Sequence, residues 1–394
     1  MLTAAEALAR ILALLTPTGI ESVPLRKAGG RVLAAPVYAR RDQPPFAASA
    51  MDGYAVRAAE ATAGARLDVV GEVAAGGEAA DPLPEGAAIR IFTGAPIPEG
   101  ADAILIQEDA DRDGDEIRVR EAPGERAYVR PAGLDFKAGS RLEAPRRLTA
   151  AEIALAAAMN APTLEVRRRP LVHLIATGDE LVEPGAEPGP SQIVSSNNYG
   201  LAAMLEAQGA DAVVQPIAPD RPEALRAALD AAAEADLIVT LGGASVGDHD
   251  LVRQVFGDES MDLSFYKVAM RPGKPLMAGR ARGRAMVGLP GNPVSSLVLG
   301  TLLLRPAVDA MLGLPAAAPA RRRLPLGSPI GPNGPREHYM RCRIEKTDGG
   351  EAVFPFPNQD SSVLSVLAAA NGLAVHPPGA GAMAAGEEID VIDL

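Results

Sequence analysis

The sequence predicts a multidomain protein of the α/β and β classes, built around a central doubly wound, mostly parallel α/β domain. Three observations predict this fold class. From about residue 170 to 312, apolar strand-like runs alternate with helix-like segments, which is typical of βαβ units. Residues 46–130 are dense in glycine, proline and short β-type runs. From residue 321 onward helix signals are absent and short β-type runs return, which predicts a small all-β domain.

The α/β region begins with a continuous apolar run, Leu171–Ala176, which is typical of a buried parallel strand. A helix is expected over about 198–208, ended by Gly209, because glycine suits a left-handed cap. Asp220 and Glu223 have the spacing of a capping box, so the next helix is expected to follow Asp220 and run to about residue 235. The other expected elements are strands over 212–217, 237–241 and 285–289 and a helix over about 294–312.

Two further helices are predicted in the N-terminal half. Thr3 and Glu6 have the spacing of a capping box, and the apolar residues that follow share one helical face. Glu6 and Arg10 interrupt the apolar run, which argues against a signal peptide. Thr149 and Glu152 open a second short helix that ends near residue 159. Short strands are expected over 20–45, and the arginine triplets 167–169 and 321–323 are expected to be solvated hinges around the α/β region.

Charge and composition exclude several classes of function. The 38 Lys and Arg residues and 50 Asp and Glu residues give a net charge of −12, so neither nucleic acid nor an anionic membrane surface is an expected partner. The one cysteine, Cys342, excludes an internal disulfide and an all-cysteine metal or iron–sulfur site. No uninterrupted run of 18 apolar residues occurs, so we expect no membrane span and a cytoplasmic location.

The loops that follow the predicted parallel strands carry the clearest functional signals, because ligands bind at the carboxyl ends of such strands. These loops read TGDEL at 177–181, GGASVGDHD at 242–250 and LPGNP at 289–293. Glycines can turn backbone N–H groups toward an anion, and carboxylates suit a hard cation such as Mg²⁺. The alternative for the second and third of these loops is a plain glycine turn that opens a helix.

Two other stretches are candidates for ligand contact. Lys267, Arg271 and Lys274 place three cations within eight residues of an acidic chain, in a loop made rigid by proline. A phosphate or oxyanion contact and a solvated charge run both remain open for this loop. In the N-terminal half, Asp52 lies in an Asp-Gly turn after two prolines, and Thr93 lies in a polar loop over 90–102. A structural turn aspartate is the alternative for Asp52.

Taken together, six segments resemble the molybdopterin molybdenumtransferase family, which is related to the C-terminal domain of gephyrin. They are PPFAASAMDGYAV, RIFTGAPIPEGADA, TGDEL, GGASVGDHD, RPGKP and GLPGNPVS, in this order along essentially the whole chain.

The resemblance implies a homodimer of four-domain subunits. The implied parts are an N-terminal helix (1–19) near the α/β domain, a small mixed domain (20–45 plus 131–169), a β-rich inserted domain (46–130), a molybdopterin-binding α/β domain (170–318) and a C-terminal β-barrel-like domain (319–394). It also implies that the inserted domain of one subunit approaches the α/β domain of the other.

The implied reaction takes adenylylated molybdopterin and molybdate, uses a divalent cation, here Mg²⁺, and releases AMP. Transient contacts with the molybdopterin adenylyltransferase and with recipient molybdoenzymes are further expected partners. The residues that match the family's catalytic groups are Asp52, Thr93, Glu180, Asp220 and Asp250. Those expected to bind substrate are Asp135, Gly242, Gly243, Ser245, Lys267, Arg271, Lys274, Pro290 and Pro293. Those expected to hold the metal are Glu180, Asp248 and Asp250.

The sequence departs from the family pattern at Ala47-Ala48, where Asp-Asn is common, and at Leu241, where serine is usual. Neither change removes an expected catalytic acid. Two alternative functions remain open at this point: a molybdopterin adenylyltransferase, and a non-catalytic scaffold like gephyrin. The chain length argues against a stand-alone adenylyltransferase, because residues 20–165 and 319–394 would then have no role.

Overall fold

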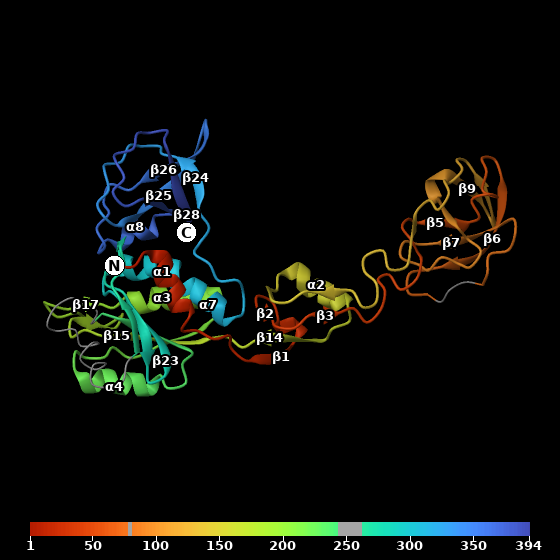
Figure 1. Cartoon of the computed structure of the whole chain (residues 1–394). Helices are drawn as coiled ribbons and strands as arrows, with labels where there is room; N and C mark the ends of the chain where they lie inside the picture. The colour runs from red at the N-terminus through yellow and green to blue at the C-terminus, as the bar shows by residue number, and fades with distance from the viewer. Residues whose placement is uncertain (78–80, 243–261) are drawn as a thin grey trace. The chain divides into compact units, whose positions relative to one another are not determined.

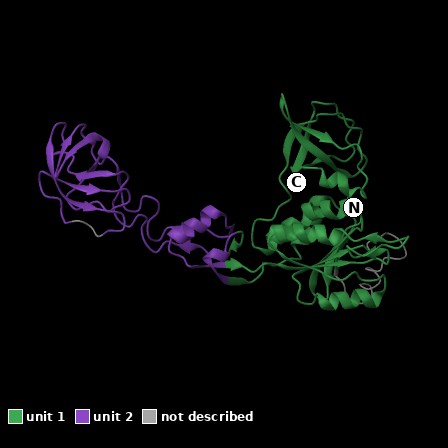
Figure 2. Cartoon of the chain, turned by 180° about the vertical axis from the view of Figure 1, so that it is seen from behind, with its two compact units in different colours: residues 1–21, 30–34, 166–394 green, residues 22–29, 35–165 purple. Residues whose placement is uncertain are grey.

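The computed structural model describes residues 1–77, 81–242 and 262–394, and the chain divides into two compact units (Figure 2). The first unit comprises residues 1–21, 30–34 and 166–394, and the second comprises residues 22–29 and 35–165. The finer domain boundaries expected from the sequence stay a prediction.

A six-stranded sheet lies at the centre of the first unit, in the order β18-β15-β19-β23-β22-β20 (Figure 1). Its first four strands pair in parallel, and β22 and β20 are added through antiparallel pairings, so the mostly parallel sheet predicted from the sequence is confirmed. The strands are β18 (Asp211–Val214), β15 (Leu171–Ala176), β19 (Leu237–Leu241), β23 (Arg284–Leu289), β22 (Met277–Ala281) and β20 (Asp262–Tyr266).

Helices cover both faces of this sheet, as a doubly wound fold requires. Along β15, Leu174 packs in the apolar cluster that includes the N-terminal and long helices, whereas its neighbour Ile175 packs in the cluster that contains α4. Figure 1 shows α4 on the other side of the sheet from α3 and α7. The helices are α1 (Ala4–Leu12), α3 (Asn197–Gln208), α6 (Pro293–Leu299) and α7 (Arg305–Met311) on one face and α4 (Pro222–Ala231) on the other.

The predicted helix over 294–312 is confirmed, with a π-helical turn over Gly300–Leu304 joining α6 to α7. Gly300 allows a close approach to α3, because an added Cβ would lie 2.6 Å from Leu201 Cδ2. Within the described ranges, Pro293–Met311 is the one helix long and apolar enough to cross a membrane, and 78% of its most apolar window is buried inside the protein. Such burial is typical of the core helix of a globular domain.

The start of α4 differs from the prediction. The helix begins at Pro222 with Arg221 at the N-cap, and no side chain caps it. Proline favours the first helical position, so it sets the start without a capping box. Asp220 therefore does not cap the helix, and its N–H donates to Asp179 Oδ1 at 3.1 Å.

The C-terminal part of the first unit contains a sheet of the order β21-β25-β27-β28-β24, with β26 paired to β25. The prediction that helices are absent here is wrong, because α8 (Leu364–Ala368) follows β26. A five-residue helix is too short to produce a recognisable period in the sequence. The strands are β21 (Met270–Arg271), β24 (Arg322–Pro325), β25 (Glu337–Thr347), β26 (Gly350–Pro355), β27 (Gly372–His376) and β28 (Glu388–Asp393).

The arginine triplets are anchored, which corrects the expectation of solvated hinges. Arg167 Nη1 donates to the Thr18 carbonyl at 2.7 Å, and Arg168 Nη2 donates to Asp236 Oδ1 at 2.8 Å. In the second triplet, Arg321 donates to Glu337 at 3.0 Å and Arg322 donates to Asp393 at 2.9 Å. The groups that accept these hydrogen bonds lie far from the triplets in the sequence, so the triplets alone do not reveal them.

The second unit contains a six-stranded sheet of the order β8-β5-β7-β6-β10-β9, with an apolar cluster on each face. Its β-rich character is as the sequence predicts. Gly53 in β5 allows close pairing with β8, because an added Cβ would lie 2.1 Å from the Leu105 carbonyl oxygen. The strands are β5 (Gly53–Val56), β6 (Arg66–Val73), β7 (Ala87–Ile91), β8 (Ala103–Ile106), β9 (Ala110–Asp113) and β10 (Glu116–Val119).

The smaller elements include a four-stranded sheet of the order β1-β14-β2-β13, two two-stranded sheets, β11-β4 and β12-β3, and the helix α2. The predicted capping of α1 and α2 is confirmed: Glu6 accepts from the Thr3 N–H at 2.8 Å, and Glu152 accepts from the Thr149 N–H at 2.7 Å. The bounds are β1 (Ile20–Pro24), β2 (Val32–Leu33), β3 (Val37–Tyr38), β4 (Ala48–Ser49), β11 (Val129–Arg130), β12 (Arg141–Leu142), β13 (Arg146–Arg147), α2 (Ala150–Ala158) and β14 (Thr163–Arg167).

The capping box of α1 predicts a measurable effect on stability. Thr3→Ala removes the hydroxyl that accepts from the Glu6 N–H, so the free energy of unfolding of the first unit should fall by about 1 kcal/mol. Thr16→Ala is the matched control, because Thr16 is exposed and lies just beyond α1. Thermal unfolding followed by circular dichroism measures both variants. Equal melting temperatures for the two variants would contradict this role of Thr3.

Candidate active site

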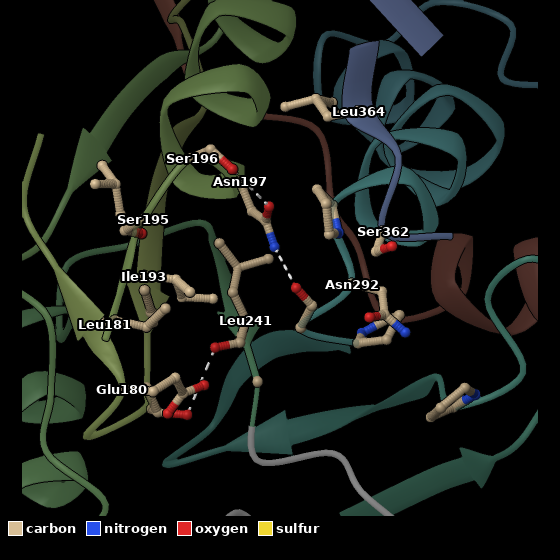
Figure 3. Close-up of a pocket in the computed structure, with 18 residues that line it drawn as sticks. Glu180, Leu181, Ile193, Ser195, Ser196, Asn197, Leu241, Asn292, Ser362 and Leu364 are labelled. Atoms are coloured by element: carbon tan, nitrogen blue, oxygen red, sulfur yellow. Dashed lines mark hydrogen bonds between the residues drawn. The ribbon is translucent and has the colours of Figure 1, made fainter. Parts of the chain in front are cut away.

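A cavity of about 640 Å³ in the first unit lies where the parallel strands end, and we call it the sheet-edge cavity (Figure 3). The ends of β15, β19 and β23 contribute Thr177, Gly242 and Pro290 to its lining. This is the edge at which the sequence predicts a ligand site. The other lining residues are Ala176, Glu180, Leu181, Ile193, Val194, Ser195, Ser196, Asn197, Leu241, Pro275, Gly291, Asn292, Pro293, Ser362 and Leu364.

One side of the sheet-edge cavity is formed by a small excursion of the chain after β15. Its two short parallel strands, β16 (Leu181–Val182) and β17 (Ile193–Val194), are joined by hydrogen bonds. The Ile193 N–H donates to the Glu180 carbonyl at 2.7 Å, and the Ser195 N–H donates to the Val182 carbonyl at 2.9 Å. The excursion therefore sets the position of Glu180, which is expected to be catalytic.

Backbone geometry at the strand ends is specific to glycine. Gly242 has a φ of +90°, and an added Cβ would lie 2.6 Å from the Thr177 carbonyl oxygen. Across the cavity, the Asn197 side chain donates to the Gly291 carbonyl at 2.7 Å and so links the start of α3 to the loop after β23. Gly242 thus lies on the cavity, whereas Gly243 and Ser245 lie outside the described residues.

Carboxylates gather beside Glu180. Burial, and then the charges of Asp179 and Glu180, raise the pKa of the Asp220 carboxyl above its ordinary value. Asp179 is a member of this group that the sequence reasoning did not name, although it lies inside the TGDEL segment. Asp248 and Asp250, the other expected metal ligands, lie outside the described residues. Within the described ranges, no three His, Cys, Asp or Glu side chains are close enough together to hold a metal ion.

A second cavity of about 290 Å³ adjoins the first and contains three cations, and we call it the oxyanion cavity. Arg271 and Lys274 line it, as the sequence predicts for an anion-binding loop. Lys267 lines neither of the two cavities, and its ammonium group lies over the Tyr266 ring at 5.1 Å. Pro275, Pro290 and Asn292 line both cavities; Pro272, Gly273, Ser295, Arg336, Gln359, Asp360 and Ser361 complete the second.

The C-terminal sheet supplies part of the oxyanion cavity, and the sequence reasoning missed this contribution. Arg336 precedes β25, and the segment from Gln359 to Ser361 follows β26. Arg341, only 1% exposed, holds that segment: its Nη1 donates to the Asp360 carbonyl at 2.8 Å, and Gln359 Nε2 donates back to the Arg341 carbonyl at 2.9 Å. The polar run Asn-Gln-Asp-Ser-Ser within a β-type region was the available signal.

In the second unit, Asp52 and Thr93 form one hydrogen-bonded group. Asp52 Oδ1 accepts from the Thr93 N–H and from the Thr93 hydroxyl, each at 2.8 Å. These two bonds, the N–H first, lower the pKa of the Asp52 carboxyl below its ordinary value, and Arg90 adds to this effect. Arg90 also donates to the Gly53 carbonyl at 3.1 Å and stacks on the Phe92 ring at 4.8 Å.

The expected site residues therefore fall into separate groups. Asp52 and Thr93 contact each other, whereas Asp135 is exposed elsewhere in the second unit and its N–H donates to the Gln43 carbonyl at 2.9 Å. In the first unit, Glu180, Gly242, Pro290 and Pro293 line the sheet-edge cavity, Asp220 interacts with Glu180, and Arg271 and Lys274 line the oxyanion cavity together with Pro290.

Known families match successive parts of this chain. The MoeA N-terminal region (domain I and II) matches residues 2–160, a probable molybdopterin binding domain matches residues 173–310, and the MoeA C-terminal region (domain IV) matches residues 323–394. A molybdopterin molybdenumtransferase from Nostoc sp. is 36% identical over 389 residues, covering 95% of this chain and 88% of that protein. The chain belongs to the molybdopterin molybdenumtransferase family.

Further family members extend this match to sequence and fold. Molybdopterin molybdenumtransferase 2 from Mycobacterium tuberculosis is 38% identical over 387 residues, which cover 95% of each chain. The crystal structure of the molybdopterin biosynthesis moeA protein from Pyrococcus horikoshii OT3 superposes with a TM-score of 0.85 at 27% identity and covers 100% of both chains. The resemblance seen in the six sequence segments and the predicted fold class are confirmed.

The Asp52–Thr93 contact predicts a shift in titration. Thr93→Val removes the hydroxyl donor and keeps the N–H, so the pKa of Asp52 should rise part of the way toward the ordinary value, as measured by carboxyl-carbon NMR against pH. Because the native pKa is lowered, the bond stabilises the fold above the unfolded pKa of about 3.9, and this stabilisation is lost as pH falls through the native pKa.

The variant should therefore be less stable than the unmodified protein at neutral pH and equally stable in acid. Thr62→Val is the control, because Thr62 is an exposed threonine of the same unit. If the pKa of Asp52 is the same in the unmodified protein and in both variants, the Thr93 hydroxyl does not lower that pKa.

Proposed function

We propose that this protein transfers molybdenum from molybdate to adenylylated molybdopterin and releases AMP. Molybdenum insertion into molybdopterin is the activity of the family, and the adenylylated substrate is the further step that we propose. The observation that carries the proposal is the pair of adjoining cavities at one edge of the sheet, which share Pro275, Pro290 and Asn292. The lining of the first includes one carboxylate, Glu180, and that of the second includes three cations and one carboxylate, Asp360, so a pterin substrate and an oxyanion can be held side by side.

The described residues suit these two reactants. Arg271, Lys274 and Arg336 line the oxyanion cavity, and charge-assisted hydrogen bonds from such groups suit the tetrahedral molybdate dianion. Glu180 lies in the adjoining cavity, where its carboxylate can orient a water molecule for attack on the phosphoanhydride of the adenylylated substrate. Hydrolysis of this phosphoanhydride consumes one water molecule and yields AMP and molybdopterin with its own phosphate.

Magnesium is the cation that we propose for this reaction. Burial, and then the negative charges of Asp179 and Glu180, raise the pKa of the Asp220 carboxyl. A divalent cation would offset the repulsion among these carboxylates, and oxygen ligands are those that Mg²⁺ prefers. Glu180 would hold it together with Asp248 and Asp250, which lie outside the described residues. When bound, Mg²⁺ neutralises the charge that develops on the phosphate oxygens.

A second subunit completes the site in this proposal. Asp52 and Thr93 of one subunit would act at the sheet-edge cavity of the other, as the family resemblance implies. Their surroundings suit a partner surface: Met51 is 39% exposed and Tyr128 46% exposed, and the Ala50 N–H donates to the Tyr128 carbonyl at 2.8 Å. Covering these two side chains with another chain would release the water around them. A cytoplasmic location, an adenylyltransferase contact and recipient enzymes also stay predictions.

Turnover with adenylylated molybdopterin, molybdate and Mg²⁺ tests the function directly. The protein should release AMP and form molybdenum cofactor, and Glu180→Gln should slow both by about a hundredfold or more. Glu187→Gln is the matched control, because Glu187 is an exposed acid of the same chain excursion and lines neither cavity. No AMP release by the unmodified protein would favour a scaffold, and adenylylation of unmodified molybdopterin with ATP would favour the adenylyltransferase.

Mixed dimers test the shared site. Asp52→Ala and Glu180→Gln subunits should each be inactive alone, and a mixed dimer should regain one competent site, formed by the intact Glu180 of one subunit and the intact Asp52 of the other. The measurement is AMP release after the two variants are unfolded together and refolded. If mixing restores no activity while a refolded unmodified control recovers fully, the two residues do not serve a shared site.

A further inference from the structure

Arg90 in β7 lies directly opposite Tyr54 in β5, in the six-stranded sheet of the second unit. Side chains that lie opposite each other in a ladder share one face of the sheet. The guanidinium carbon of Arg90 lies 5.1 Å from the centre of the Tyr54 ring and 4.8 Å from the centre of the Phe92 ring. Two aromatic rings therefore restrict the orientation of this guanidinium group.

Two hydrogen bonds join Arg90 to the surroundings of Asp52. Arg90 Nη1 donates to the carbonyl of Gly53, the residue that follows Asp52, at 3.1 Å. Arg90 Nη2 donates to Gln107 Oε1 at 2.9 Å. A guanidinium group is planar and presents its N–H groups in a fixed fork, so these two bonds set the positions of the two oxygens relative to each other.

Gln107 relays the contact of Arg90 to the backbone of Asp52. Because β5 begins at Gly53, Asp52 lies just outside the strand. The Asp52 carbonyl accepts from the Gln107 N–H at 3.2 Å. Arg90 therefore contacts the residue that follows Asp52 and the residue whose N–H holds the Asp52 carbonyl, whereas Thr93 holds the carboxylate itself. The position of the carboxylate depends on both sets of contacts.

Arg90 also acts on Asp52 through its charge. The hydrogen bonds from the Thr93 N–H and then from the Thr93 hydroxyl lower the pKa of the Asp52 carboxyl, and the positive charge of Arg90 lowers it further. The two hydrogen bonds of Arg90 end on neutral oxygens, a backbone carbonyl and a side-chain amide. They do not neutralise the guanidinium charge, which therefore acts on the nearby carboxylate.

We propose that Arg90 is a positioning residue for Asp52, because it holds the backbone of Gly53 and, through Gln107, that of Asp52 itself. Arg90 does not touch the substrate in this role; it sets where the carboxylate lies. This inference rests on the proposed function, in which Asp52 acts on the substrate. A misplaced reacting group slows the chemical step more than it weakens substrate binding, so loss of Arg90 should lower kcat and leave KM nearly unchanged.

Arg90→Met tests this role, because it removes both hydrogen bonds and the charge but keeps an unbranched chain beside the two rings. The kcat of AMP release from adenylylated molybdopterin should fall about tenfold or more, with KM nearly unchanged. The pKa of Asp52, followed by carboxyl-carbon NMR, should rise, but less than in Thr93→Val, because the Thr93 hydrogen bonds are the larger cause. Arg118→Met is the matched control, because Arg118 is an exposed arginine in β10 of the same sheet. Melting temperatures show whether the variants stay folded.

Arg90→Lys separates the fork from the charge, since lysine keeps the charge but lacks the planar fork. It should keep the pKa of Asp52 near the native value and still lower kcat. The inference is overturned if Arg90→Lys turns over at the native rate, if the loss in Arg90→Met is confined to KM, or if Arg90→Met matches Arg118→Met in both turnover and the Asp52 titration. Absent AMP release by the unmodified protein would instead overturn the proposed function, and the Asp52 titrations would still show whether Arg90 acts on this carboxylate.

Discussion

The parallel register of β15, β19 and β23 sets the position of both cavities. Ala176 pairs with Leu241, and Leu241 pairs with Leu289, so the three strands end at the same level of the sheet. Thr177, Gly242 and Pro290 follow directly, and each lines the sheet-edge cavity. A shift of one residue in either pairing would move a strand end by about 3.3 Å and exchange the two faces of that strand. Loops that lie more than 100 residues apart in sequence therefore converge because the strands are held in register.

This constraint explains why so much of the site could be predicted from sequence. The apolar run at 171–176 and the glycine-rich loops that follow the later strands are local signals, and parallel strands bring such loops to one edge. Gly242 and Pro290 were found this way, and both lie on a cavity. The start of α4 was misplaced because Pro222 competes with the capping signal at Asp220, and proline at the first helical position needs no cap.

The contribution of the C-terminal sheet could not be predicted in the same way. Arg341 is buried and holds Gln359 and Asp360 through hydrogen bonds to neutral oxygens, an arrangement that only tertiary contacts define. Arg336 is one of many arginines in the sequence, and nothing in its neighbourhood marks it as part of the cavity. The charge of the oxyanion cavity follows partly from packing, because Arg336 joins Arg271 and Lys274 from a segment more than 60 residues further along the chain.

The late position of these C-terminal residues has a consequence for biosynthesis on the ribosome. The strands, helices and glycine loops of the parallel sheet are all translated by residue 311, but Gln359, Ser361 and Leu364 come some fifty residues later and line the two cavities. The whole parallel sheet is therefore translated before the last residues of the two cavity linings. We expect molybdate and the substrate to bind tightly only after this last segment has emerged and packed, so an unfinished chain should leave both ligands free.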